Sequence, residues 1–263
     1  MPKAMMKTFG AAAIAASILG AAIATAPRSA QAAGEAVPIP SYDWSFSGIF
    51  GTFDRAAMQR GFQVYTEVCA SCHGLEYIAF RNLAALGYDE DQIKAIAATY
   101  TVGDGPDDFG EMFEREAIPA DRFPPPFANE NAARAAMGGA YPPDLSLMTK
   151  KRANGVNYLH ALLIGYEDPP AGVEVPEGQY WNAYFPGHLI SMPPPLLEDQ
   201  VEFSDGTPAT VEQMSSDLTT FLAWAAEPMM EERKRMGVKA LLFLLVLTAL
   251  LYAVKRKIWA DIH

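Results

Sequence analysis

The sequence is poor in cysteine and in positive charge. Only two of its 263 residues are cysteines, Cys69 and Cys72, so it has no disulfide framework of the kind that stabilises small secreted domains. Its 20 Lys and Arg stand against 31 Asp and Glu, a net charge of −11. Nucleic-acid-binding proteins need a basic surface, and this balance argues against that class. The chain also lacks internal repeats and a glycine-rich phosphate-binding loop.

Both cysteines lie in the stretch Cys69-Ala70-Ser71-Cys72-His73, which matches the Cys-x-x-Cys-His attachment motif of c-type haem. Two thiols three positions apart can each add to one vinyl group of a porphyrin. The next residue, His73, can then bind the iron as its proximal ligand. We therefore expect one covalently bound haem c.

Three other interpretations of this motif are weaker. A thioredoxin-like redox pair needs no histidine directly after it and prefers a βαβ context, which this sequence does not show. A zinc site needs two further Cys or His ligands at close spacing, and the chain has no third cysteine. A disulfide between Cys69 and Cys72 would be short and strained.

Residues 1–32 have the pattern of a cleaved signal peptide. A short basic start is followed by a small, apolar run over residues 9–26 and by an A-x-A cleavage pattern that ends at Ala32. A membrane-anchoring helix is the alternative, but the run is rich in Ala and only weakly hydrophobic. We expect the mature chain to begin near Ala33, outside the cytoplasm, where c-type haem is attached.

A second apolar segment lies near the C-terminus. Residues 240–254 are 15 uninterrupted apolar residues, fewer than the roughly 20 that a membrane span needs. Lys239 can extend the span because its amine can reach the interface. A basic triplet at 255–257 follows directly, which argues against a buried core helix and places the C-terminus in the cytoplasm. Orientation by the positive-inside rule is weakened here, because basic residues at 233–235 lie on the other side of the apolar run. The signal peptide determines the orientation instead.

These segments divide the chain into three parts: a signal peptide (1–32), an exposed domain (33–230), and an anchor with a short tail (231–263). The exposed domain holds 10 basic and 28 acidic residues, a net charge of −18. Such a field attracts a basic partner and speeds its encounter at low salt. Solubility alone needs less charge than this.

Helical signals dominate the secondary structure expected for the exposed domain. A helix over residues 54–68, with Thr52 or Asp54 as N-cap, leads into the haem motif. Further helices are expected at 89–100, 129–136, 154–164 and 216–226. The stretches 102–143 and 166–215 are rich in Gly and Pro and predict loops, with a small hairpin at 201–210. Apolar side chains ahead of the first helix are expected to cover the domain: Trp44, Phe46, Ile49, Phe50 and Phe53.

The second axial iron ligand must come from far along the chain. The candidates are Met112, Met137, Met148, Met192, Met214, His160 and His188. Met192 is favoured because three prolines follow it directly, and a stiff loop holds a thioether on iron at little entropic cost. His188 shares that loop but fits a surface histidine, and His160 lies within a helix. Met/His ligation leaves no open iron position and points to electron transfer rather than oxygen chemistry.

The ordered set of motifs resembles the cytochrome c1 family, the haem subunits of cytochrome bc1 (quinol–cytochrome c reductase) complexes, in their bacterial type. The matching stretches are VCASCHGLEYIAFRNL (68–83), DGPDDFGEMF (104–113), NAARAAMGGAYPPDLS (131–146), YFPGHLISMPPPL (184–196), FSDGTPAT (203–210) and WAAEPMMEERKRMG (224–237). Together they span nearly the whole mature chain. The Cys-x-x-Cys-His motif alone is shared by many cytochromes, whereas the ordered set is specific.

The resemblance implies a mainly α fold: a c-type cytochrome haem domain with long loops and one C-terminal transmembrane helix. It implies that Cys69 and Cys72 attach the haem, that His73 and Met192 ligate its iron, and that Arg134 lies near a haem propionate. A guanidinium suits a carboxylate because it offers a fork of donors, although an exposed helix arginine is the alternative for Arg134.

The resemblance also implies partners and a location. The chain would receive an electron from a Rieske iron–sulfur protein, pass it to a basic soluble c-type cytochrome, and sit beside cytochrome b. It would cross the bacterial inner membrane once, with its haem domain in the periplasm, and no residue would serve as catalytic acid, base or nucleophile. Two alternatives are a free-standing membrane-anchored cytochrome shuttle and a haem-based sensor or peroxidase.

Overall fold

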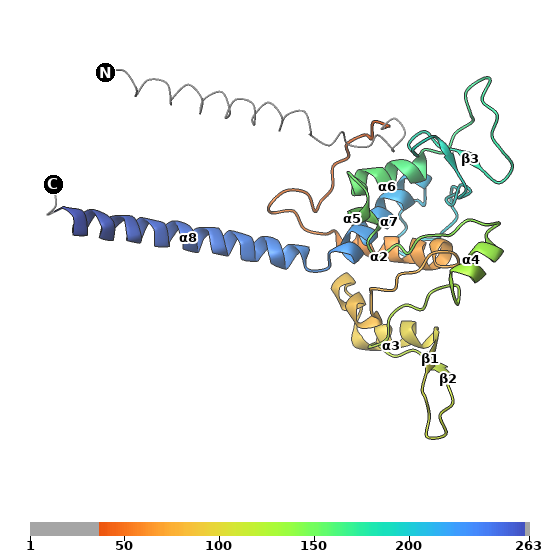
Figure 1. Cartoon of the computed structure of the whole chain (residues 1–263), viewed down its shortest axis with the longest axis horizontal. Helices are drawn as coiled ribbons and strands as arrows, with labels where there is room; N and C mark the ends of the chain where they lie inside the picture. Colours follow the sequence, from red (N-terminus) through yellow and green to blue (C-terminus); the bar gives the residue numbers. More distant parts are fainter. Residues whose placement is uncertain (1–36, 261–263) are drawn as a thin grey trace, which may run out of the picture. The chain divides into compact units, whose positions relative to one another are not determined.

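The structure is a computed structural model that describes residues 37–260, so the predicted signal peptide lies outside the described residues. It is mainly helical, as predicted (Figure 1). The helices are α2 (Arg55–Val64), the π-helical turn η1 (Tyr65–Cys69), the 3-10 helix η2 (Phe80–Leu86), α3 (Glu90–Ala98), α4 (Glu130–Ala136), α5 (Met148–Lys151), α6 (Gly155–Ile164), α7 (Val211–Ala226) and α8 (Met230–Trp259). The strands are β1 (Thr101–Asp104), β2 (Phe113–Glu116), β3 (Tyr180–Trp181) and β4 (Leu189–Ile190).

The helix that leads into the Cys-x-x-Cys-His motif begins where predicted. Asp54 is its N-cap, and the Asp54 carboxylate accepts hydrogen bonds from two backbone N–H groups of the first turn. The regular helix α2 ends at Val64, earlier than expected, because residues 65–69 form a π-helical turn. A 2.8 Å hydrogen bond from the Ala70 N–H to the Tyr65 carbonyl closes that turn. Wide turns of this kind are frequent at functional sites.

Two of the other predicted helices begin at a side-chain cap near the expected position. Asp89 caps α3 and Asn129 caps α4, each within the expected range. Helix α7 begins at Val211 rather than at 216, because the Thr210 hydroxyl accepts the capping hydrogen bond at 3.1 Å. The sequence reading missed this cap because it placed residues up to 215 in a loop.

The strands form two short antiparallel hairpins, β1–β2 and β3–β4, in stretches predicted to be loops. The hairpin predicted at residues 201–210 was wrong, since this stretch contains turns but no strand. Val201, Phe203 and Ala209 are buried there against the helices. The Asp205 carboxylate accepts a hydrogen bond from Arg60 of α2 at 2.7 Å. Side-chain burial and this ion pair hold the segment to the helices, in place of pairing between strands.

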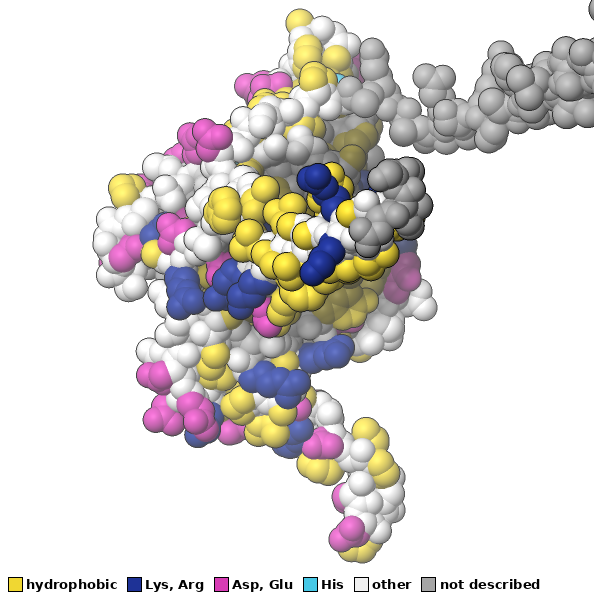
Figure 2. Space-filling view, turned by 90° about the vertical axis from the view of Figure 1, so that its left-hand side faces the viewer, with side chains coloured by type: hydrophobic (Ala, Val, Ile, Leu, Met, Phe, Trp, Pro, Cys, Tyr) yellow, Lys and Arg dark blue, Asp and Glu magenta, His cyan; other side chains and the backbone are white. Residues whose placement is uncertain are grey.

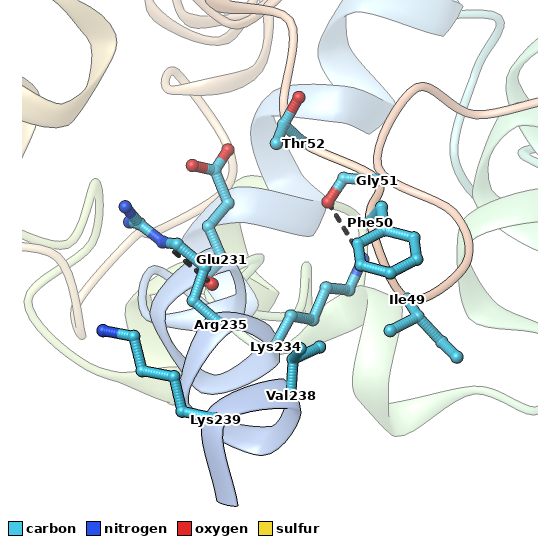
Figure 3. Close-up of a pocket in the computed structure, with 9 residues that line it drawn as sticks. All are labelled: Ile49, Phe50, Gly51, Thr52, Glu231, Lys234, Arg235, Val238 and Lys239. Carbon is cyan, nitrogen blue, oxygen red and sulfur yellow. Dashed lines mark hydrogen bonds between the residues drawn. The ribbon is translucent and has the colours of Figure 1, made fainter. Parts of the chain in front are cut away.

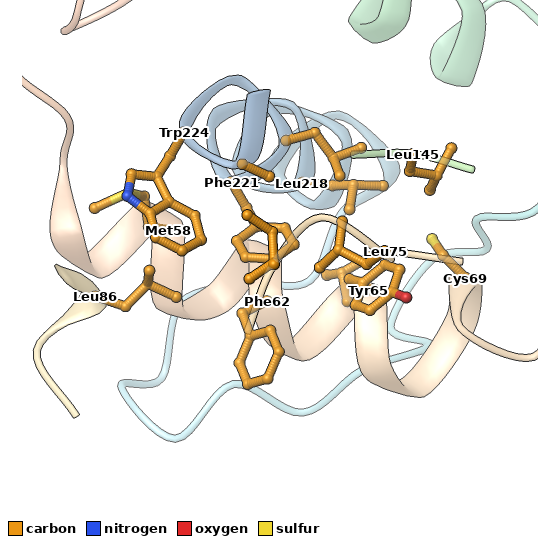
Figure 4. Close-up of a cluster of buried hydrophobic side chains, with 14 of the residues drawn as sticks. Met58, Phe62, Tyr65, Cys69, Leu75, Leu86, Leu145, Leu218, Phe221 and Trp224 are labelled. Carbon is orange, nitrogen blue, oxygen red and sulfur yellow. The ribbon is translucent and has the colours of Figure 1, made fainter. Parts of the chain in front are cut away.

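The centre of the domain is the packing of α2 against α7 (Figure 4). The Phe62 and Phe221 rings lie 5.5 Å apart, and Tyr65 and Phe221 lie 5.9 Å apart. Gly61 permits this approach, because a Cβ there would lie 2.1 Å from the carbonyl oxygen of Asp217 on α7. Cys69 belongs to the same buried cluster, so the haem motif starts from the core.

Helix α8 is the one helix among residues 37–260 that is long and apolar enough to cross a membrane. Its 30 residues correspond to a length of about 45 Å, more than the roughly 30 Å of a bilayer core. Its first turns are attached to the domain. Glu231 accepts a hydrogen bond from the Phe53 N–H at 2.8 Å, and Lys234 donates to the Phe46 carbonyl at 2.6 Å.

The apolar segment ahead of α2 covers the domain only in part. Phe46 and Phe53 are buried and their rings lie 5.0 Å apart. Ile49 and Phe50 were expected to cover the domain as well, but they are exposed at the tip of a loop. The prediction was wrong for these two side chains because the chain turns back between the two buried phenylalanines, with a hydrogen bond from the Thr52 N–H to the Ser45 carbonyl.

Candidate haem site

The attachment motif forms a compact turn at the end of η1. The N–H groups of Cys72 and His73 both donate to the Cys69 carbonyl, at 3.1 and 2.9 Å. Both thiols are free, so the strained disulfide is not formed. Cys69 is buried and Cys72 is half-buried, and burial raises the pKa of the Cys69 thiol to about 12. The turn thus presents two thiols and one imidazole from five consecutive residues.

His73 is oriented by a distant backbone group. Its Nδ1 lies 2.8 Å from the carbonyl oxygen of Pro143, 70 residues further along the chain. A carbonyl only accepts, so Nδ1 carries the hydrogen and Nε2 presents a free lone pair. Histidines that bind metals usually donate their other N–H in this way. Burial lowers the pKa of His73 and favours the neutral imidazole, which is the form that binds metals.

A second hydrogen bond holds the backbone of this histidine. The hydroxyl of Tyr65, in the first position of η1, donates to the His73 carbonyl at 3.1 Å. Tyr65 is itself buried against Phe123 and Phe221 of the core. The ring and the backbone of His73 are therefore fixed from two different segments.

Met192 lies in a second apolar cluster, two residues after β4. The buried members of that cluster are Tyr158, Leu162 and Ile190, with Ile39, Tyr166, Phe185 and Met192 packed against them. The Tyr166 hydroxyl donates to the Met192 carbonyl at 3.1 Å. Three prolines, 193–195, follow on the other side. The backbone at Met192 is thus held by a hydrogen bond to its carbonyl and by the prolines that follow it.

The other candidate axial ligands have clear structural positions. Met148 and Met214 are buried in the main core, and Met112 is 70% exposed. Met137 is half-buried at the end of α4. His160 is buried with its Nδ1 2.8 Å from the Ser215 hydroxyl, as a structural histidine would be.

His188, the runner-up in the Met192 loop, is tied to its own hairpin. It has a positive φ of 62°, and its Nδ1 lies 3.1 Å from the Asn182 carbonyl. Its ring stacks on Trp181 with 4.7 Å between ring centroids. These contacts give the histidine a local structural role at the β3–β4 hairpin.

Arg134 lies on α4 with an exposed side chain. Its guanidinium pairs with Glu130 at 2.6 Å and donates to the Gly139 carbonyl at 2.9 Å. It also lies over the Tyr141 ring. These contacts order the segment that leads to Pro143, the residue that orients His73. A role toward a haem propionate stays a prediction.

The structure therefore brings Cys69, Cys72 and His73 together on one turn and places Met192 in a different apolar cluster. The donor set fits a c-type haem: two free thiols, an imidazole with Nε2 free, and a half-buried thioether. The buried indole N–H of Trp181 has no partner within residues 37–260, so one more donor is available for a polar group. No cluster of three or more His, Cys, Asp or Glu that could hold a metal ion occurs in that range.

Sequence reasoning missed the groups that hold the ligands in place. The carbonyl of Pro143 is 70 residues from His73 in the sequence, and the hydroxyl of Tyr166 is 26 residues from Met192. No local sequence pattern predicts such contacts. The prolines at 142–143 were the one available signal, because a rigid segment is suited to presenting a carbonyl.

The chain is similar to a known protein family and to several of its members. The model of the Cytochrome C1 family matches residues 44–262. The cytochrome c1 of Rhodospirillum rubrum is 51% identical over 249 residues, which cover 89% of this chain and 92% of that protein. A mitochondrial cytochrome c1 heme protein of Arabidopsis thaliana is 54% identical over 230 residues, 88% of this chain and 75% of that protein.

A third relative is longer. The cytochrome b/c1 of Bradyrhizobium diazoefficiens is 54% identical over 246 residues, which cover 85% of this chain but only 36% of that protein. The range matched by the family model includes the haem motif, the Met192 loop and α8. The chain therefore belongs to the cytochrome c1 family, whose cofactor is haem c.

Proposed function

We propose that this chain is the electron-transfer haem subunit of a cytochrome bc1 complex. The observation that carries the proposal is the orientation of His73, whose Nδ1–H is held by the Pro143 carbonyl so that Nε2 is free beside two free thiols. When bound, haem c supplies a one-electron couple. The named relatives include a protein called the cytochrome b-c1 complex catalytic subunit, from Candida albicans, 51% identical over 224 residues.

Different residues of this chain would attach the haem and ligate its iron. Cys69 and Cys72 would hold the haem covalently. His73 would ligate the iron from the same turn, and Met192 would ligate it from the second apolar cluster. The hydrogen bonds that hold His73 and Met192 would limit their movement between oxidation states and so would lower the reorganisation that electron transfer requires. Arg134 would neutralise a propionate in exchange for, or together with, its ion pair to Glu130.

The proposed route starts at a Rieske iron–sulfur protein and ends at a soluble c-type cytochrome, with quinol chemistry in cytochrome b. Co-purification tests the two proposed partners within the complex, cytochrome b and the iron–sulfur protein. Purification from native membranes in mild detergent should yield this chain together with cytochrome b and an iron–sulfur protein. Elution of the haem-loaded chain alone would instead support a free-standing membrane-anchored shuttle.

We further propose that residues 1–32 are a removed signal peptide, that 33–230 lie in the periplasm of a bacterium, and that α8 crosses the inner membrane with the C-terminus in the cytoplasm. A chain ending at Met236 should then be a soluble, haem-loaded periplasmic domain, because it lacks the apolar part of α8. Fractionation in high salt tests this. Retention of that fragment in the membrane would reveal a second anchor.

A shorter fragment provides the matched comparison. A chain ending at Glu227 should also be soluble but less stable, because it loses buried Met230 and the hydrogen bonds from Glu231 to Phe53 and from Lys234 to Phe46. Thermal unfolding of the two fragments should separate these contributions. Equal stability would show that the first turns of α8 do not contribute to the domain.

The acidic surface predicts how the soluble partner associates. Glu167, Asp168, Glu174 and Glu177 are exposed on the loop between α6 and β3, which leads into the hairpin before Met192. Single surface ion pairs contribute about 0–1 kcal/mol, so collective steering dominates and is screened beyond roughly 8–10 Å at physiological salt. The association rate constant for a basic cytochrome should fall about tenfold or more as salt rises, while electron transfer within the complex changes little.

Stopped-flow oxidation across a salt series measures this rate. Glu174→Gln with Glu177→Gln should slow association more than Asp108→Asn with Glu111→Gln on the β1–β2 hairpin, although both pairs remove two charges. A rate that does not depend on salt would mean that docking is apolar and that the acidic surface serves solubility.

A further inference from the structure

A groove of about 380 Å³ lies where α8 leaves the domain (Figure 3). One wall is the loop at residues 49–52, and the other is one face of α8. The side chains that matter to the argument are Ile49, Phe50, Lys234, Arg235, Val238 and Lys239. None of them has a part in the haem site described above.

The loop wall of the groove is apolar and held open. Ile49 is 67% exposed and Phe50 is 83% exposed. The loop cannot simply fold these side chains inward, because Lys234 donates to the Gly51 carbonyl at 3.2 Å and Glu231 accepts from the Phe53 N–H at 2.8 Å. The fold thus keeps two large apolar side chains in contact with the surroundings beside α8. Large exposed apolar groups of this kind mark binding surfaces.

The helix wall carries positive charge. Arg235 and Lys239 are one helical turn apart, so they share a face of α8 with Val238 beside them. Within residues 37–260, the Lys239 ammonium has no hydrogen-bond or ion-pair partner, and only the Nε of Arg235 is engaged, weakly, at 3.4 Å from the Glu231 carbonyl. The acid in the groove, Glu231, already accepts from Phe53. Glu231 keeps its negative charge, but the groove also holds Lys234, Arg235 and Lys239, so three cations face one carboxylate.

We propose that this groove binds an anionic phospholipid, with Arg235 and Lys239 on its phosphate and with Ile49, Phe50 and Val238 against the first part of its acyl chains. The inference rests on α8 being the membrane anchor. In that case the groove lies at headgroup level, because the apolar residues of α8 start directly after Lys239 and are exposed on every face. Figure 2, which looks from the C-terminal side of α8, shows basic side chains on the domain surface around the apolar helix.

A lipid is favoured over a protein segment by the order of the groups. The cationic side chains lie at the domain end of the helix, and an unbroken apolar surface follows them. A phospholipid has the matching order, with its charged headgroup followed by its acyl chains. Clusters of Lys and Arg beside a membrane helix attract anionic lipids by about a few-fold per residue. This basic edge stands out because the domain as a whole is strongly acidic.

The test uses the full-length, haem-loaded chain in a neutral detergent. Equal amounts of the anionic lipid POPG and the zwitterionic lipid POPC are added, and native mass spectrometry counts the lipids retained. The wild-type chain should retain one POPG in preference to POPC. Arg235→Gln with Lys239→Gln should weaken POPG retention on the order of 30-fold. It should weaken POPC retention much less, because the choline cation already offsets the phosphate charge of POPC. Ile49→Ser with Phe50→Ser should weaken retention of both lipids.

A control double variant distinguishes a specific lipid site from general electrostatic attraction between the protein and anionic lipid. Arg81→Gln with Lys151→Gln removes two exposed cations outside the groove and should leave POPG retention unchanged. Equal loss in both double variants, or no loss in either, overturns the proposal. Loss of cytochrome b from the purified Arg235→Gln, Lys239→Gln protein with POPG retention unchanged would assign the groove to a protein contact instead. The haem spectrum and the need for detergent, recorded alongside, report separately on the proposed function.

Discussion

Replacing Met192 by leucine is expected to leave the haem covalently attached but to lower its reduction potential by roughly 0.1 V or more, within the ~0.8 V range that axial ligands set. The thioether favours the ferrous state, and leucine offers no lone pair to replace it. The ferric absorption band at the red end of the spectrum, typical of sulfur bound to iron, should disappear as well. Potentiometric titration and the ferric spectrum measure the two effects.

Met137→Leu is the matched control for this substitution. Met137 is also half-buried, but it ends α4 and is not part of the Met192 cluster. Its replacement should leave the potential and the ferric band unchanged. An unchanged potential in Met192→Leu, or a lowered one in Met137→Leu, would reassign the ligand.

A second variant distinguishes attachment from ligation. Cys69→Ser with Cys72→Ser should leave no haem stain after denaturing electrophoresis, whereas Met192→Leu should retain the full stain. The distinction follows from the geometry, since the two thiols lie on one turn while Met192 approaches from a separate cluster. A haem stain in the serine variant would contradict the proposed attachment site.

The parts of this molecule that could be predicted from the sequence are those specified by neighbouring residues. The Asp54 cap of α2, the start of the helix at residues 89–100 and the apolar run of α8 are each local patterns. Their structures match the predictions because hydrogen bonds within a few residues, or side-chain chemistry alone, determine them.

The parts that escaped prediction depend on distant contacts. The hydrogen bond between His73 and the Pro143 carbonyl is made by proximity in the fold, as is the bond from Tyr166 to the Met192 carbonyl. The π-helical turn before Cys69 is another case, because it resembles regular helix in sequence. Residues 201–210 show the converse error. The Asp205-Gly206 pair suggested a hairpin, whereas burial against the core and the hydrogen bond from Arg60 determine the conformation.

The ion pair between Arg60 and Asp217 gives the second large expected effect. The Asp217 carboxylate is 2% exposed and lies in the α2–α7 interface. It accepts two hydrogen bonds from Arg60, at 2.7 and 3.0 Å, and one from Gln213 at 2.9 Å. Arg60→Leu leaves this carboxylate buried without its cation, which should lower the free energy of unfolding by about 3–5 kcal/mol. That is a large part of the 5–15 kcal/mol typical of a domain.

Urea unfolding of the full-length protein in detergent, followed by the haem absorption band, measures this loss. Lys94→Leu is the matched control, because Lys94 also pairs with two carboxylates, Glu90 and Asp91, but all three side chains are exposed. Its replacement should change the free energy of unfolding far less, because solvent screens an exposed ion pair. Arg60→Leu combined with Asp217→Leu should recover most of the lost stability, because no buried charge remains unpaired. If the double variant is as unstable as Arg60→Leu alone, the loss comes from the packing of the arginine side chain, whose guanidinium lies over the Phe203 ring, and not from the charge left on α7.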